Sequence, residues 1–183
     1  MTQTSPSNSA LRVADLSQNT TVPFALRPDA IALAEIAATL ELTALRKLSF
    51  EGQLRPIGKT DWRLTGRLGA TVVQPCVVTL DPVTTRIDKN VERQFVADYA
   101  DPEDPEVEMP EDETTEALGE WIDPALVMQE ALALAMPDYP RKEGAELGQM
   151  VYTKPGEVAM TDEDARPFAG LADLKAQLEK DAE

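Results

Sequence analysis

The sequence predicts an α+β fold: a single domain with a curled antiparallel sheet of three to five strands, one N-terminal helix, one buried helix and flexible ends. Three observations predict it. Residues 48–99 contain long stretches that alternate apolar and polar side chains, as strands with one wet face do. Residues 29–40 carry apolar residues at helical spacing. Residues 124–136 form a second helical stretch that is apolar on nearly every side.

The chain before the sheet is predicted to contain a tail, a short strand and a helix. Residues 1–20 are rich in Ser, Thr, Asn and Gln, which predicts a disordered tail. Residues 22–26 suit an edge strand, because Pro23 lacks an N–H to donate. Asp29 is the expected N-cap of a helix. Its apolar positions are Leu33, Ile36, Ala37 and Leu40.

The sheet itself is predicted from three alternating runs. The first has Leu48, Phe50, Gly52 and Leu54 on one face, and the second has Trp62, Leu64, Gly66, Leu68, Ala70 and Val72. Residues 57–61 supply the turn between these two runs. The third run places Val83, Ile87, Val91, Phe95 and Tyr99 inward. Gly52, Gly66 and Gly69 permit the bends of a curled sheet.

The second half is predicted to hold an acidic loop over residues 100–116, a helix and a tail. Asp123 and Pro124 have the residue types of an N-cap and a first helical position. The helix they open, residues 124–136, is so apolar that we expect it to be covered on most sides. The α+β domain therefore spans residues 21–142. Residues 143–183 are expected to be mostly irregular, ending in a short helix over 168–178.

Composition excludes most catalytic classes. The chain of 183 residues has no histidine and one cysteine, so Ser-His-Asp sites, Cys-His sites and zinc sites with imidazole or four thiolates are excluded. The acidic loop lacks the turn glycine of a calcium loop. We therefore expect no catalytic residue, no metal, no cofactor and no small-molecule substrate. No apolar run is long enough to span a membrane, and the N-terminus does not have the pattern of a secretory signal. Both observations predict a cytoplasmic protein and no membrane partner.

The negative charge of the chain is concentrated in one segment. The net charge is −16, but residues 1–97 hold 11 Lys and Arg against 9 Asp and Glu, whereas residues 98–140 hold 14 acids and no base. The acidic loop is either a solvated connection or a surface that attracts a basic partner. The mildly basic first half leaves nucleic-acid binding open.

Six basic residues in the first strand pair are candidate nucleic-acid contacts: Arg46, Lys47, Arg55, Lys59, Arg63 and Arg67. Arg63 and Arg67 share the outward face of their strand, and phosphate contact is one interpretation of the set. The other is an ordinary wet face, since no aromatic RNA-binding motif accompanies the cluster.

Two further residues have a functional and a structural interpretation. Cys76 is either a reactive thiol or a turn residue without chemistry, and no second ligand accompanies it. Glu130 lies in the apolar helix, where a buried carboxylate needs a partner. An enzyme that uses carboxylates alone would need a second acid beside Glu130 in a cleft.

Three separated segments together resemble the YceD family of large ribosomal RNA subunit accumulation proteins. They are residues 72–83, which include Cys76; residues 130–140, which include Glu130, Pro137 and Pro140; and residues 166–175, which include Pro167, Phe168, Leu171 and Leu174. The resemblance runs from about residue 22 to residue 178. It implies a role in the synthesis, processing or stability of 23S rRNA rather than an enzymatic activity.

This chain departs from the family pattern at the positions where many members carry residues that look like a zinc site. Cys76 matches the first cysteine of a Cys-x-x-Cys pair, but Thr79 stands at the second, and no thiol or imidazole follows the apolar helix. Arg166 replaces the asparagine of the closing motif. We expect packing to hold the turn instead of a metal, and Cys76, Glu130, Pro137 and Pro140 to act structurally.

The resulting hypothesis is a non-catalytic factor that supports large-subunit assembly by binding rRNA or a basic ribosomal protein. Pro167, Phe168, Leu171 and Leu174 are candidate partner-docking residues, because a short helix does not persist alone in water. Docking on its own domain is the alternative for that helix. The alternative functions are a carboxylate enzyme centred on Glu130 and a protein–protein adaptor unrelated to ribosomes.

Overall fold

Three long strands form the body of the sheet. The computed structural model describes residues 7–99 and 114–146. Residues 1–142 form one compact unit, which contains every helix and strand named below, and residues 143–183 form a second. The sheet has the order β2-β3-β4-β5-β6. Its strands are β2 (Val22–Leu26), β3 (Ala44–Ile57), β4 (Asp61–Pro75), β5 (Pro82–Val96) and β6 (Thr115–Ala117).

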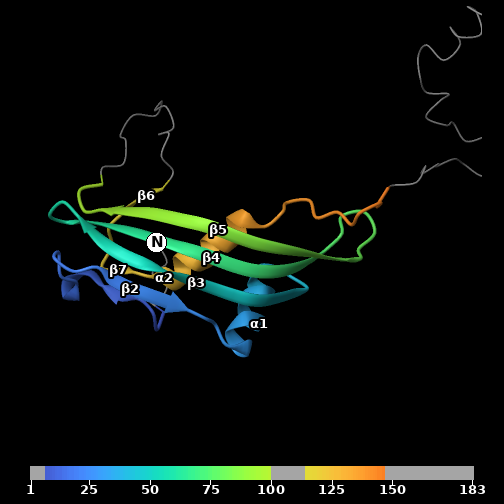
Figure 1. Cartoon of the computed structure of the whole chain (residues 1–183), viewed down its shortest axis with the longest axis horizontal. Coiled ribbons are helices and arrows are strands. Elements are labelled where there is room, and N and C mark those ends of the chain that lie inside the picture. Colours follow the sequence, from blue (N-terminus) through green and yellow to red (C-terminus); the bar gives the residue numbers. More distant parts are fainter. Residues whose placement is uncertain (1–6, 100–113, 147–183) are drawn as a thin grey trace, which may run out of the picture. The chain divides into compact units, whose positions relative to one another are not determined.

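The predicted α+β class is confirmed, with an open, mostly antiparallel sheet (Figure 1). The strands β2 to β5 are antiparallel to one another, and β2 is an edge strand, as its proline predicts. The last strand differs from the prediction. Residues 115–117 lie parallel to β5, so the predicted acidic loop ends earlier than residue 116. Residues 100–113 of that loop lie outside the described residues.

The apolar face of the sheet carries the core. Phe50, Leu54, Trp62, Leu64 and Leu68 are fully buried there, as the alternation predicts. Gly66 makes room for this packing, because a Cβ on it would lie 2.6 Å from Cε2 of Phe50. In the third run, Ile87, Val91 and Phe95 are buried. Tyr99 is not inward as predicted: it is 42% exposed and lies beyond the end of β5.

Helix α1 (Ala30–Thr39) begins where the sequence predicts. The Asp29 carboxylate accepts a hydrogen bond from the Ala32 amide at 2.9 Å, so it satisfies one of the free donors of the first turn. Ile36 is its buried residue, and the helix lies beside β3 (Figure 1). The helix therefore adds Ile36 to the core beside β3.

Helix α2 (Pro124–Ala135) packs on β4 and β5 with one face only (Figure 1). Asp123 caps it by accepting from the Ala125 amide at 2.9 Å. Val127, Met128, Ala131 and Leu132 are buried. The prediction that the helix is covered on most sides is wrong: Leu126 is 51% and Leu134 is 72% exposed. One apolar face is thus in the core while another faces solvent.

The chain before β2 is partly ordered, in contrast to the prediction of a disordered tail over residues 1–20. Strand β1 (Leu11–Arg12) pairs with β7 (Trp121–Ile122), and a turn of 3-10 helix follows at Val13–Asp15. The Ser7 amide and hydroxyl both donate to the Asp123 carboxylate. The tail is held because Leu11, Val13 and Leu16 pack against the core, a contribution that polar composition does not reveal.

Candidate nucleic-acid interface

The side of the sheet opposite α2 is polar, and it is called the outer face below. Register fixes its members, since residues that pair across antiparallel strands share a face. They include Arg46, Glu51, Gln53 and Arg55 of β3, Arg63, Thr65 and Arg67 of β4, and Arg86, Asp88, Asn90, Glu92 and Gln94 of β5.

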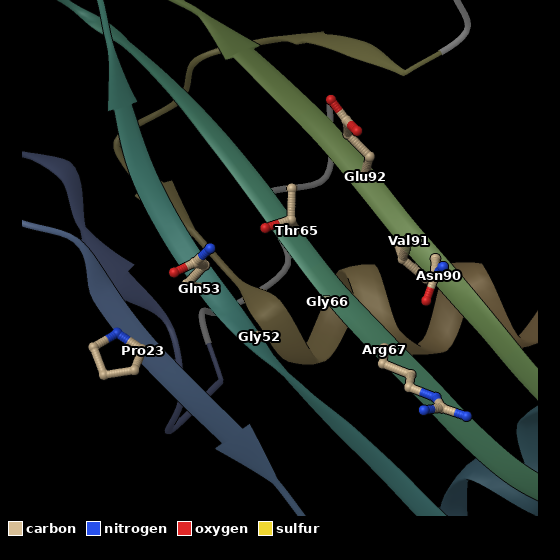
Figure 2. A pocket seen from close by; sticks show the side chains of 9 residues that line it. All are labelled: Pro23, Gly52, Gln53, Thr65, Gly66, Arg67, Asn90, Val91 and Glu92. Carbon is tan, nitrogen blue, oxygen red and sulfur yellow. The ribbon is translucent and has the colours of Figure 1, made fainter.

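A shallow hollow of about 680 Å³ lies on the outer face. Figure 2 shows Gln53, Thr65, Arg67, Asn90 and Glu92 around it, with α2 behind the sheet. The lining is completed by Pro23, Gly52, Gly66 and Val91. Polar and charged side chains therefore line an open depression rather than an enclosed pocket.

Every acid on the outer face is already engaged. Glu51 accepts a hydrogen bond from Arg27 at 2.6 Å and Asp88 accepts one from Arg86 at 2.7 Å, and Glu92 forms an ion pair with Arg63 at 3.2 Å. The Arg86 guanidinium lowers the pKa of the Asp88 carboxyl, and Asp88 in turn raises the pKa of Arg86. Asp61, at the start of β4, accepts from the Ala97 amide at 3.0 Å.

The arginines of the outer face outnumber these acids. Arg46, Arg55 and Arg67 are exposed and have no ion pair within residues 7–99 and 114–146. Arg55 of β3 also lies directly opposite Arg63 of β4 in the strand register. Like charges at directly opposed positions destabilise a sheet. An anion over these two strands would relieve that repulsion.

The structure brings together four of the six predicted basic residues. Arg46, Arg55, Arg63 and Arg67 share the outer face. Lys47 instead lies at a bulge, with a φ of 53°, and Lys59 lies in the turn between β3 and β4. Arg86 belongs to the same face but was not among the predicted contacts. The parity of its strand position would have identified it.

Cys76 anchors the connection between β4 and β5. Its buried Sγ accepts hydrogen bonds from the Val78 and Lys142 amides, each at 3.4 Å. Hydrogen bonds from Thr79, first of all its hydroxyl, and from the Lys142 amide lower the pKa of the Cys76 thiol to about 6. The Lys142 ammonium also binds the Asp81 carboxylate at 2.9 Å.

The segment after α2 returns to the same turn. Gln74 donates its side-chain amide to the Pro137 carbonyl at 3.2 Å, and the Val77 amide donates to the Pro140 carbonyl at 2.9 Å. Thr79 and Lys142, which stand near the positions of family metal ligands, thus converge on Cys76. A hydroxyl and an amide cannot replace thiolates and imidazoles, so this residue set does not fit a zinc site.

Glu130 lies in α2, as predicted, but its surroundings differ from the prediction. It is exposed rather than buried, and it lies 3.5 Å from Arg93 of β5. Arg93 also pairs with Glu116 of β6 at 3.1 Å, and burial raises the pKa of the Glu116 carboxyl. The second acid that a carboxylate enzyme would need therefore exists. Because both acids hold one arginine, their arrangement links α2, β5 and β6 electrostatically.

Two further expectations concern other parts of the chain. The candidate docking residues Pro167, Phe168, Leu171 and Leu174, with the predicted final helix, lie outside the described residues. In the described part, no helix is long and apolar enough to cross a membrane. No group of three or more potential metal-ligating side chains occurs there.

Comparison with known proteins gives one match. The family model described as large ribosomal RNA subunit accumulation protein YceD matches residues 64–175. This range begins in β4 and includes the Cys76 turn, α2 and the closing motif. No curated protein and no solved structure matches the chain.

Proposed function

Because the chain belongs to the YceD family of large ribosomal RNA subunit accumulation proteins, we propose that it is a non-catalytic factor that binds 23S rRNA. Binding would support the synthesis, processing or stability of that RNA during assembly of the large subunit. The outer face of the sheet is the proposed contact surface.

The observation that carries this proposal is the surplus of arginine on the outer face. Arg46, Arg55 and Arg67 are exposed beside acids that already have partners. Arginine presents a planar set of donors that suits phosphate oxygens. The sheet holds these side chains on one surface, so several phosphates of one strand can be contacted together.

The net charge of −16 sets a condition on this binding. The protein as a whole repels a polyanion, so long-range attraction cannot supply the affinity. Contacts must act at short range, where the arginines outweigh distant acids that salt screens. The acid-rich segment 98–140 would then weaken the binding of RNA that lacks the specific site.

Salt dependence of RNA binding tests the proposal. Each phosphate contact changes the slope of log K against log salt by about −0.7 to −0.9. Arg67→Glu should therefore weaken binding of a 23S rRNA fragment and reduce the slope by about one contact. Filter binding over a salt series measures both quantities.

Arg141→Glu is the matched control, because it makes the same charge change at an exposed residue outside the outer face. Equal losses for the two variants would mean that only total charge matters. No loss for Arg67→Glu would contradict the proposed surface.

The carboxylate enzyme is the less favoured function. Glu130 and Glu116 share Arg93, so both carboxylates already serve as ion-pair partners of one arginine. The family description, which refers to RNA accumulation, also points away from it.

A further inference from the structure

In the described part of the chain, strand β5 has an open edge along most of its length. It pairs with β4 over its whole length without a register shift, whereas β6 covers only Gln94 to Val96 on the other side. The Gln94 amide donates to the Thr114 carbonyl, and the Val96 carbonyl accepts from the Leu118 amide, so even-numbered residues face the β6 side. Backbone direction alternates along a strand.

The backbone groups of Thr84, Arg86, Asp88, Asn90 and Glu92 therefore point away from β4. Within residues 7–99 and 114–146 they have no backbone partner. A row of unpaired N–H and C=O groups is a template for another strand.

A groove of about 450 Å³ runs along this edge. Residues 89–93 of β5 form one side, Ala131 and Leu134 of α2 form the other, and Thr114 lies at the end. Leu134 is 72% exposed although it belongs to a helix that packs on the sheet. Free backbone groups and an apolar wall together meet the two needs of strand addition, which are hydrogen bonds and pockets for alternate side chains.

The surroundings indicate the chemistry of the occupant. On the outer side the edge presents Asp88 and Glu92, which are ion-paired with Arg86 and Arg63, while Lys89 and Arg93 line the groove on the side of α2. The sequence that continues from β5, residues 98–113, has nine acids and no base, and it rejoins the described chain at Thr114 of the groove. A second copy with net charge −16 would be repelled, while a basic segment would be attracted.

We propose that the edge of β5 binds an extended segment of a basic protein, one that alternates apolar and basic residues. Its backbone pairs with residues 84–92. Its apolar side chains lie against Leu134 and Ala131, and its basic side chains lie beside Asp88 and Glu92. The backbone edge and the groove belong to β5 and α2, whereas the arginines proposed for RNA, unpaired within the described residues, belong to β3 and β4. Asp88 and Glu92 lie between the two sites and pair with Arg86 and Arg63 of the outer face.

The test uses the full chain and a fluorescent synthetic peptide of alternating valine and lysine, with binding followed by anisotropy. Asn90→Pro removes one outward N–H and should weaken binding about tenfold, the worth of one backbone hydrogen bond. Proline is tolerated at an edge position whose N–H faces away from the sheet. Asn90→Ala keeps the N–H and should bind like the wild type.

Two further pairs separate strand addition from simple charge attraction. Leu134→Lys should weaken binding, whereas Leu126→Lys, on the same helix but outside the groove, should not. A peptide methylated on alternate backbone nitrogens should lose binding at unchanged charge. Equal binding of the methylated and plain peptides, or of the proline and alanine variants, would overturn the proposal.

Amide exchange of the protein without peptide tests whether the edge is open. The amides of Arg86, Asp88 and Asn90 should exchange fast, and those of Ile87, Lys89 and Val91 slowly. Protection of the first set in a monomer would mean that the chain covers its own edge. Protection in a dimer, identified by light scattering, would mean that a second copy does. Either result contradicts the proposal. The Arg67→Glu variant, which tests RNA binding, should bind the peptide normally.

Discussion

Cys76 shows how one side chain can hold a turn through hydrogen bonds to its sulfur. Its sulfur accepts two amide hydrogen bonds and lies beside the Thr79 hydroxyl, which stabilises the thiolate. The turn, the start of β5 and the segment after α2 meet at this atom. The charge of the thiolate is therefore linked to the folded state.

This linkage predicts a pH dependence of stability. The pKa of Cys76 falls from 9.0 to about 6 on folding, so its stabilising contribution is present above pH 9 and is lost as pH falls through about 6. Because the chain has no histidine, the N-terminal amine is the other group whose ordinary pKa lies between pH 6 and pH 9. Wild-type melting temperature should rise from pH 6 to 9, and that of Cys76→Ser should stay nearly flat. Parallel plots of melting temperature against pH for the two proteins would contradict a contribution of the Cys76 thiolate.

Helix α2 has two apolar faces with opposite surroundings. Leu132 is fully buried on the sheet, and Leu134, two residues later, is 72% exposed. Helical periodicity cannot separate them, because apolar residues occupy nearly every position of the helix. The assignment of faces follows from which side contacts β4 and β5.

Leu132→Asp should destabilise the protein strongly, and Leu134→Asp should not. A carboxylate buried without a partner costs several kcal/mol, against a total stability of about 5–15 kcal/mol. At the exposed position the change should stay within about 0.5 kcal/mol. Urea denaturation of the two variants measures the difference, and equal midpoints would mean that α2 is not part of the core.

Local patterns predicted most elements. Strand alternation, the Asp29 and Asp123 caps and the proline of β2 depend only on residues that are close in sequence. The same parity predicted that Arg63 and Arg67 share a face. Contacts between distant segments were not predictable in this way. The approach of Glu116 and Glu130 to Arg93, and of Lys142 to Cys76, depends on where β6 and α2 return in space.

On the scale of the whole molecule, the described helices and strands all lie within residues 1–142. A chain ending after Glu146 keeps each contact named above, including those of Lys142 with Cys76 and Asp81. Its melting temperature should match that of the full chain. A much lower value would show that the removed residues belong to the core.

The same truncation bears on the closing motif, whose docking role remains a prediction. If Pro167, Phe168, Leu171 and Leu174 contact a partner, the shortened chain should fold normally but no longer sediment with large-subunit precursors. Retained co-sedimentation would contradict partner docking by this motif.

The open edge of β5 also has a consequence for solubility. Exposed edges are sites of sheet-to-sheet aggregation, and natural proteins protect them with charged residues. Here the side chains from Arg86 to Arg93 include three arginines or lysines besides two acids, interrupting what would otherwise be a Val- and Ile-bearing amyloid-type segment. These charges oppose edge-to-edge strand pairing, and the excess of acid elsewhere makes copies of the protein repel one another. Near the isoelectric point of about 4.3 the repulsion between copies disappears. Storage and crystallisation in that range would therefore favour fibrous association through this strand.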